Sequence, residues 1–536
     1  MSNKTTASTQ RGIFRAASGA MIASAAIGLA SCGGGGDQRN SPNGEGNSPN
    51  GEPFGQILTG ESQAVWGGFH VTATRPGVTP FISLVDVSGT EIGNVAAVEF
   101  SIAPKPGSVS KPVHVHYSNA ALSREGHLST ELVTVPVFGL YAGFANQVSV
   151  LLDFMDGSTA TLPLVITTAP YTDPNGIYDH PTVFVPRTAG SALSFDFFVT
   201  KSDLGTPVII DTDAEIRWVS VGVSDGSISA LTDDGFVVGS PTTSTIYRLG
   251  FDGSVSSSTP PNAFWYEYHH NIDYGKEALL FEVNDYYSHG VQNLETTLLE
   301  MDPTGIVDHK WDLAQIVSSY MSSQGDDPTA FVRPGVDWFH MNSSTYDPSD
   351  DSVIVSSRED FLIKLDYTTG NIKWILGDPT KYWYTFPSLR AKALTLAPGG
   401  LYPIGQHSAS ITSDGLVMVM NDGLNSANQP AGEPAGERRT FSAVSAYSID
   451  PVNRTAEEVW RFDYGQSILS PICGSSYEAS GGSYLVDFAT ADNLTRARLV
   501  GLDSGHNVVF DFQYDSKPCG TSWNATPIAL DNFAIL

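Results

Sequence analysis

Short runs in which apolar and polar residues alternate make up most of the chain after about residue 60. Segments such as 96–104 (AAVEFSIAP) and 111–118 (KPVHVHYS) keep a period of two, and Gly, Pro, Asn and Asp separate one run from the next. Alternation with this period is typical of half-buried strands, and turn residues at this frequency end each strand after a few residues. The pattern therefore predicts an all-β protein.

Two kinds of strand grouping follow one another along the chain. Residues 59–170 hold short strands and turns, which predict a small N-terminal β-sandwich. After Pro170 a different unit recurs: an apolar strand, an Asp, a turn, and a strand that often carries Trp. It appears six times at spacings of 41 to 84 residues, which predicts a six-bladed β-propeller over residues 171–536. The aspartates of the six units are Asp211, Asp252, Asp302, Asp366, Asp450 and Asp503.

Composition supports this organisation and narrows the function. The chain has 536 residues, 52 Gly and 32 Pro, and only 16% of its residues are charged. Its length exceeds what one small core needs, so more than one domain is expected. The net charge of −29 argues against a nucleic-acid-binding protein, which needs a basic surface.

The first 58 residues differ from the rest. Residues 1–31 carry Lys4, Arg11 and Arg15, then a small-residue apolar run that is too short to span a membrane as a helix. This pattern predicts a lipoprotein signal peptide over residues 1–31. The run ends in "LASC", which resembles a bacterial lipoprotein box with Cys32 as the lipidated residue. Residues 32–58 are rich in Gly, Asn, Pro and Ser and predict a flexible tether. We therefore expect an exported protein with a lipid anchor at a membrane, facing the periplasm or the cell surface. An acidic residue directly after the lipidated cysteine would act as a signal for retention in the inner membrane. Gly33 stands there instead, so we favour the outer membrane.

Only two other cysteines occur, Cys473 and Cys519. An exported compartment permits a disulfide, and two cysteines are the number that one bridge needs. A structural disulfide is the favoured interpretation, and a free reactive thiol is the alternative.

A second recurring element carries the chemistry. His270, His340 and His407 each precede a turn and an apolar strand, and they are 70 and 67 residues apart. This spacing predicts that the three histidines begin equivalent innermost strands of three successive blades. They would then converge on the central channel.

Asn342 and Arg358 lie on the same predicted hairpin as His340. An amide and a guanidinium both donate hydrogen bonds to an oxyanion, and imidazole can act as nucleophile or base near neutral pH. The hairpin therefore predicts a clamp for a tetrahedral anion. Two alternatives compete: the histidines are structural channel residues, or they bind a metal such as zinc. We expect no metal, because no Asp or Glu alternates with the histidines and a guanidinium disfavours a neighbouring cation.

At these residues the sequence resembles a known family. The stretches "WFHMNSSTYDPSDDSVIVSSR", "IKLDYTTGNIKWILGDP" and "GQHSASITSDG" are similar to the bacterial aryl-sulfate sulfotransferases, exported six-bladed propellers with a small N-terminal sandwich. The resemblance covers roughly residues 60–536. It implies transfer of a sulfuryl group from an aryl sulfate donor to a phenolic acceptor, without a cofactor.

The resemblance also implies roles for individual residues. His407 matches the nucleophile that becomes sulfated, and His340, Asn342 and Arg358 match sulfate-binding groups. His270 matches the remaining active-site histidine, although Asn271 follows it here where the family usually has Asp. The cysteine pair that enterobacterial members carry shortly before the nucleophile does not occur in this chain.

Aromatic residues near these motifs are candidates for binding the aryl ring, with packing in the propeller as the alternative. An aryl sulfate hydrolase and a non-catalytic, lipid-anchored binding propeller are the competing functions, and a homodimer remains open. The candidate ring-binding residues are Trp338, Phe339, Trp383 and Tyr384.

Overall fold

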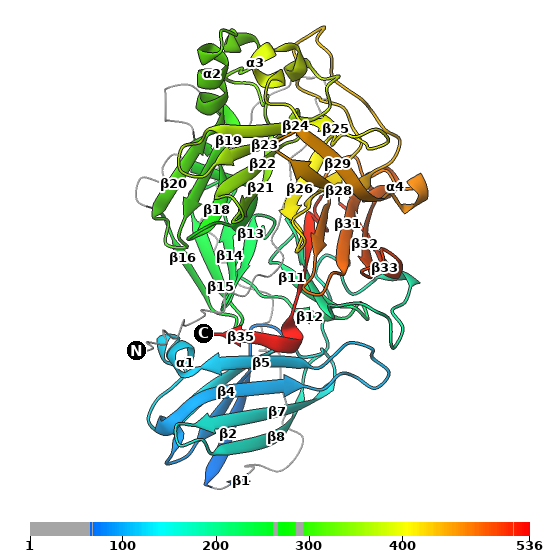
Figure 1. Ribbon diagram of the computed structural model, residues 1–536. Coiled ribbons are helices and arrows are strands. Elements are labelled where there is room, and N and C mark those ends of the chain that lie inside the picture. Colours follow the sequence, from blue (N-terminus) through cyan, green and yellow to red (C-terminus); the bar gives the residue numbers. More distant parts are fainter. Residues whose placement is uncertain (1–64, 67, 261–265, 286–292, 518) are drawn as a thin grey trace, which may run out of the picture.

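The computed structural model describes residues 65–66, 68–260, 266–285, 293–517 and 519–536. Two bodies built from strands lie one above the other (Figure 1). The predicted signal segment, Cys32 and the tether lie outside the described residues. No helix in the described part of the chain combines the length and apolar character needed to cross a membrane.

The smaller body is a sandwich of two sheets, and its described strands other than β35 lie within the predicted range 59–170. One sheet has the order β1-β2-β3-β6 and the other β35-β5-β4-β7-β8. Alternate residues of each strand are buried, as the period of two predicts, and their side chains form one apolar cluster. The strands are β1 (Val65–Trp66), β2 (Phe69–Pro76), β3 (Ile82–Ser88), β4 (Val95–Ile102), β5 (Val113–Ser118), β6 (Leu132–Phe138), β7 (Ala145–Phe154), β8 (Thr159–Thr167) and β35 (Phe533–Ile535).

The larger body is a six-bladed β-propeller, which confirms the predicted fold class. Its six sheets contain four or five strands each, and their innermost strands contact one another in succession from β13 to β34. From the inner to the outer edge, blade 1 is β34 (Asn524–Ile528), β10 (Phe197–Lys201), β11 (Val208–Asp211) and β12 (Ile216–Trp218); blade 2 is β13 (Ser229–Thr232), β14 (Gly235–Gly239), β15 (Ile246–Gly250) and β16 (Val255–Ser258); blade 3 is β17 (Tyr266–Tyr274), β18 (Leu279–Asp285), β19 (Asn293–Met301) and β20 (Val307–Asp312). Blade 4 is β21 (Met341–Asp347), β22 (Ser352–Ser357), β23 (Phe361–Asp366) and β24 (Ile372–Gly377); blade 5 is β26 (Gln406–Ile411), β27 (Val417–Asn421), β28 (Ala443–Asp450), β29 (Thr455–Phe462) and β25 (Thr395–Leu396); blade 6 is β30 (Ser475–Glu478), β31 (Tyr484–Thr490), β32 (Arg496–Leu502), β33 (Val508–Asp515) and β9 (Thr182–Val185).

The six predicted Asp hairpins lie one to a blade, at the turn between the third and fourth strands. The Asp carboxylate accepts hydrogen bonds from backbone N–H groups of the turn, as Asp211 does from Asp213 and Glu215 and Asp302 does from Thr304. Such Asx turns satisfy backbone donors where the ladder is interrupted. The recurring Asp is therefore a turn residue and does not belong to the functional site.

The two ends of the propeller sequence close the ring. β9, the first propeller strand in the chain, adds to the outer edge of blade 6, and β34 near the C-terminus is the innermost strand of blade 1. The structure joins Cys473, just before β30, to Cys519, just before β34, in a disulfide with Cα atoms 6.0 Å apart. Trp523 packs against both cysteines, and its indole N–H donates to the carbonyl oxygen of His270 over 3.4 Å. The bridge thus supports the closure of the ring beside a candidate site residue.

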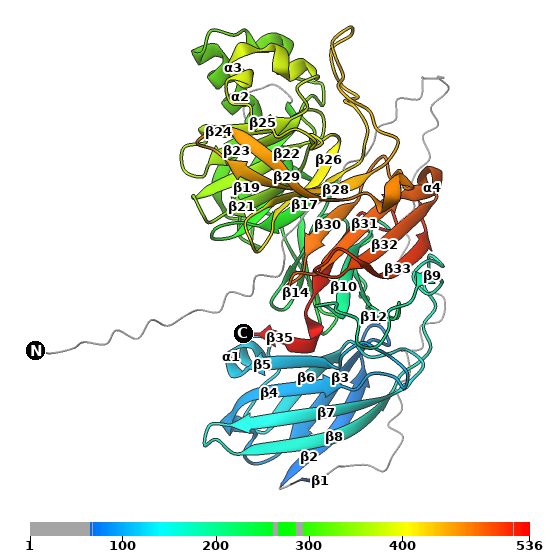
Figure 2. The same ribbon diagram turned by 45° about the vertical axis from the view of Figure 1, so that its right-hand side comes forward.

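The chain then returns to the sandwich. β35 pairs in parallel with β5, so the last strand of the predicted propeller range belongs to the sandwich sheet (Figure 2). A side-chain ion pair between Lys111 and Asp531 accompanies this pairing. The sequence boundary missed it because three apolar residues carry no sign of which sheet they join. The helices are short: α1 (Asn119–Arg124), α2 (Leu313–Ser323), α3 (Pro387–Arg390) and α4 (Ala491–Leu494), with single 3-10 turns at η1 (Ile92–Asn94), η2 (Pro328–Ala330), η3 (Tyr382–Thr385), η4 (Tyr464–Gln466) and η5 (Leu530–Asn532).

Candidate active site

The three predicted histidines come together at the inner strands of blades 3, 4 and 5. His270 lies on β17, His340 immediately precedes β21, and His407 lies on β26. All three side chains are buried, and the rings of His270 and His340 are 5.0 Å apart. The Nε2 atom of each ring has no hydrogen-bond partner within the described residues. Three buried imidazole nitrogens without partners are costly in a structural core, which favours a role in binding or catalysis.

The three histidines do not, however, occupy equivalent positions. The carbonyl oxygen of His340 accepts the backbone N–H of Arg358, and in the next blade the carbonyl oxygen of Gly405 accepts the backbone N–H of Asp422. His340 and Gly405 also share a left-handed backbone, with φ of +53° and +54°. Gly405 is therefore the counterpart of His340. His407 lies two residues farther along its strand, so the prediction of equivalence is wrong for this residue.

His270 does match His340. Its φ is +54°, and in both blades a side chain three residues later bonds to the next blade: Asp273 accepts from the Ser344 N–H, and Ser343 accepts from the Ala409 N–H. By the same count, His407 corresponds to Asn342. His270 and His340 thus occupy equivalent positions on the inner strands of blades 3 and 4. His407 lies two residues farther along the inner strand of blade 5.

The local backbone fixes the tautomer of His407. Its Nδ1 lies 2.8 Å from the carbonyl oxygen of Gly405, and a carbonyl can only accept. Nδ1 therefore carries the proton, and Nε2 carries the lone pair. Burial, together with the positive charges of Arg358 and His340, lowers the pKa of His407 to about 3. The imidazole is neutral at physiological pH, and its Nε2 has no hydrogen-bond partner among the described residues.

Gly405 is required at this position because a Cβ atom there would collide with the carboxylate of Asp422. The positive φ alone does not demand glycine, since His270 and His340 adopt the same backbone conformation. The Asp422 carboxylate thus lies close to Gly405, the residue whose carbonyl oxygen orients the ring of His407.

Arg358 is buried and held by two carboxylates. Its Nη1 donates to Glu359 over 3.0 Å and its Nη2 donates to Asp422 over 2.9 Å. A guanidinium has five N–H donors, so three remain for an anion. Burial raises the pKa of Asp422 to about 6, and Arg358 opposes that rise. The predicted anion-binding arginine is thus fixed in one orientation rather than free to move.

Asn342 is fully buried between blades 4 and 5. Its Nδ2 donates to the carbonyl oxygen of Gln406 over 2.8 Å, next to His407 in sequence. The amide therefore links the strand that carries His340 to the strand that carries His407. One of its two N–H bonds is used in this link, and the second is available to a ligand.

His340 differs electrostatically from the other two histidines. Its Nδ1 hydrogen-bonds the Asp337 carboxylate and lies 3.1 Å from Oε2 of Glu295. Burial opposes the charge, but the Glu295 and Asp337 carboxylates raise the pKa of His340 to about 9. Burial instead drives the pKa of His270 well below its ordinary value. Burial also raises the pKa of Glu295 to about 8, and the neighbouring His340 opposes that rise, so the two groups titrate as a pair. His340 therefore favours the protonated form, whereas His270 and His407 favour the neutral form.

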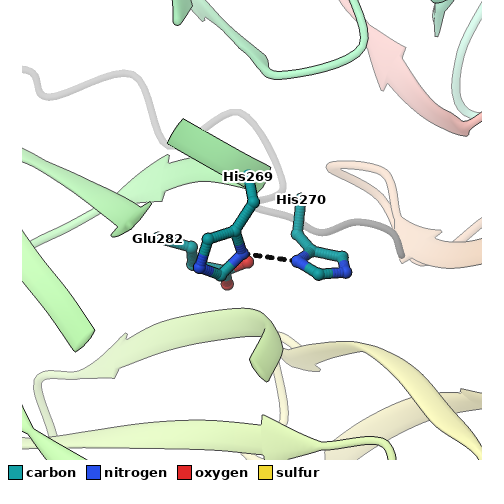
Figure 3. A group of neighbouring side chains, drawn as sticks. All are labelled: His269, His270 and Glu282. Carbon is teal, nitrogen blue, oxygen red and sulfur yellow. Dashed lines mark hydrogen bonds between the residues drawn. The ribbon is translucent and has the colours of Figure 1, made fainter. Parts of the chain in front are cut away.

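His269 adds a fourth imidazole. Figure 3 shows its ring hydrogen-bonded through Nδ1 to Nδ1 of His270, with the Glu282 carboxylate behind it. These three groups, and also His270, Glu295 and His340, are close enough in space to be considered as metal ligands. In the first group, each Nδ1 is already engaged with the other. In the second, Glu295 faces the protonated His340. In both groups, members are thus engaged with one another, through the Nδ1–Nδ1 hydrogen bond in the first and the Glu295–His340 contact in the second.

The candidate ring-binding aromatics lie in a hydrophobic cluster. Trp338, Phe339 and Trp383 are almost completely buried, and Tyr384 packs against the same cluster. The ring of Trp383 is 5.3 Å from that of Phe361, and its N–H donates to the carbonyl oxygen of Asp378. These contacts account for the four residues as packing residues. Contact with an aryl substrate stays a prediction.

Sequence reasoning missed the acidic partners of the site. No acid alternates with the histidines along the chain, yet folding places Glu282, Glu295 and Asp337 against them. Two signals were available: Asp337 is three residues before His340, and Glu282 interrupts an apolar strand. Glu295 gave no such signal in the sequence, because it lies on β19, which comes near the histidines only after the chain has folded.

Fold and site together define a six-bladed propeller with a buried group of three histidines, an amide and a guanidinium. Comparison with known families identifies the class of protein. Residues 180–524 match the arylsulfotransferase (ASST) family model, and residues 77–169 match the arylsulfotransferase Ig-like domain. The chain belongs to the arylsulfotransferase family, which confirms the resemblance seen in the sequence and the sulfotransferase prediction.

Individual relatives are distant. The chain is 24% identical over 502 residues to the arylsulfate sulfotransferase AssT of Escherichia coli O6:H1, covering 74% of this chain and 80% of that protein. It is also 24% identical over 229 residues to AssT of Lelliottia amnigena, covering 34% and 37% of the two chains. Among solved structures, Saccharomyces cerevisiae Sqt1 aligns over 68% of this chain and 81% of its own, with 11% identity and a TM-score of 0.28. That likeness is too low to bear on the fold, which rests on the strand pairing.

Proposed function

We propose that this protein transfers a sulfuryl group from an aryl sulfate ester to a phenolic acceptor through a sulfohistidine on His407. The observation that carries the proposal is the state of that residue. Its Nδ1 proton is held by Gly405, its ring is neutral, and its Nε2 is buried without a partner among the described residues. That is the state a nucleophilic imidazole needs.

The neighbouring groups support each step. Nε2 of His407 attacks sulfur, the S–O bond breaks, and the bond pair leaves on the aryl oxygen. The remaining N–H groups of Arg358 and Asn342 are suited to the sulfuryl oxygens, and His270 or His340 exchanges a proton with the aryl oxygen. A phenol then attacks the sulfohistidine in the reverse sequence, which gives ping-pong kinetics.

Release of the donor phenol tests this function. Incubation with 4-nitrophenyl sulfate, with and without added phenol, should show release that the acceptor stimulates, together with formation of the new sulfate ester. Release at the same rate without an acceptor would identify a hydrolase instead. No release would favour a binding propeller.

We further propose that the protein is exported and anchored through a lipidated Cys32. The support is the basic N-terminus, the apolar run ending in "LASC", and the Gly-rich tether that follows. An anchored enzyme of this kind would act on substrates outside the cytoplasm.

A further inference from the structure

The sequence does not distinguish the roles of His270 and His340, but the two imidazole rings have different contacts in the structure. Among the described residues, Nε2 of neither ring has a hydrogen-bond partner, but His340 contacts two carboxylates and His270 contacts one. This asymmetry bears on which histidine handles the proton of the leaving phenol.

The contacts of His340 are specific to one ring nitrogen. Nδ1 hydrogen-bonds Oδ2 of Asp337 and lies 3.1 Å from Oε2 of Glu295. Carboxylates accept, so Nδ1 is the protonated donor, and its two acceptors favour the ring form that carries a second proton on Nε2. Nε2 is the atom on the other side of the ring, without a partner in the described part of the chain.

The backbone that carries each carboxylate is held in place. The side-chain amide of Asn428 donates to the backbone carbonyl oxygen of Asp337 over 2.8 Å, and the backbone N–H of Glu295 donates to Oδ1 of Asn284 over 2.8 Å. The Asn428 amide also lies 3.5 Å from Oδ2 of the Asp337 carboxylate. Glu295 also lies 3.7 Å from Nε2 of His270, between the two rings. The pair is therefore built into the site rather than placed by mobile surface side chains.

We propose that Asp337 and Glu295 are positioning residues that keep His340 protonated on both ring nitrogens, so that its Nε2 delivers a proton to the departing aryl oxygen. The inference rests on the proposed function and assigns the acid step to one histidine. As the S–O bond breaks and the bond to Nε2 of His407 forms, the proton passes from Nε2 of His340 to the aryl oxygen. In the second half-reaction, the same nitrogen takes a proton from the acceptor phenol.

The remaining charged groups around His340 are accounted for. Glu359 adds negative charge at longer range, and the histidines of blades 3 and 5 are neutral. Arg358 is nearby, but Glu359 and Asp422 neutralise it. Among the described residues, the two positioning carboxylates are thus the groups whose removal should alter the proton affinity of His340 most.

Leaving-group dependence tests the inference. A poor leaving group such as phenol needs a proton in the transition state, whereas 4-nitrophenol, a better one, needs it far less. In the donor half-reaction without acceptor, Asp337→Asn and Glu295→Gln should each slow the burst of phenol from phenyl sulfate by about 10²-fold, and that from 4-nitrophenyl sulfate by less than about tenfold. Asp327→Asn and Glu277→Gln, at exposed positions, are the controls and should change neither.

The pH profile and a double variant separate positioning from general structure. The phenyl sulfate burst should decline above about pH 9 as His340 loses its proton, and Asp337→Asn should move this decline to lower pH. In a His340→Gln background, Asp337→Asn should add little further loss, since both substitutions disable the same step. Equal losses for both donors, an unmoved alkaline decline, or additive losses in the double variant would overturn the inference. Failure of the wild type to form a sulfohistidine would instead refute the proposed function, so the two failures are distinguishable.

Discussion

Replacing Arg358 with alanine removes a guanidinium that two carboxylates hold near His407. Loss of a single preorganised donor to a developing anion typically costs about 10²–10³ in rate, or roughly 3–4 kcal/mol. The same change leaves the buried carboxylates of Asp422 and Glu359 without their partner, because Nη2 and Nη1 bind them at 2.9 and 3.0 Å. Breaking a buried pair of this kind destabilises a protein by roughly 3–5 kcal/mol. We therefore expect Arg358→Ala to lose both activity and stability.

The double variant Arg358→Ala/Asp422→Asn separates the two losses. It removes the unpaired charge on Asp422, so the thermal midpoint should recover toward that of the wild type. The donor half-reaction with 4-nitrophenyl sulfate should remain slower by at least about 10²-fold, because the anion-binding donor is still absent. Recovery of the rate together with the midpoint would refute the reasoning, since Arg358 would then serve only to neutralise its neighbours.

Three further predictions concern the backbone, the disulfide and the anchor. Gly405→Ala should lower the rate at least about tenfold, since it strains a positive φ and pushes on Asp422, whereas Gly205→Ala, with open space around it, should not; equal rates would contradict the account. Cys473→Ser/Cys519→Ser should lower the thermal midpoint by several degrees in non-reducing buffer, because the bridge closes a 46-residue separation worth about 4 kcal/mol of chain entropy; an unchanged midpoint would show that the ring closes without it. Cys32→Ser should move the protein from the detergent phase to the aqueous phase after extraction, and unchanged partitioning would refute the anchor.

Much of the fold could be predicted because local chemistry repeats. Each blade has a strand, an Asp turn and a second strand, and the Asp carboxylate caps that turn wherever it occurs. The last strand could not be assigned, because β35 is three residues long and pairs with β5 more than 400 positions earlier. Pairing of β35 with β5 depends on where the folded propeller places the C-terminal residues.

The site was predicted in part for the same reason. Histidines spaced by a blade length must approach a common axis, so His270, His340 and His407 could be placed together. Their exact register could not, because a two-residue offset depends on where the chain adopts positive φ, and Gly405 takes that role in blade 5. The carboxylate partners of His340 come from a loop and from a strand two positions outward in another blade, so only the folded chain shows them.

Trapping the covalent intermediate tests the central claim most directly. The protein is mixed with an aryl sulfate donor without acceptor, quenched rapidly at alkaline pH, digested, and analysed by mass spectrometry. The account predicts a mass gain of one SO3 group on the peptide containing His407, and its loss when a phenol is added before the quench. A label on His270 or His340, or a label that persists in His407→Asn, would contradict it.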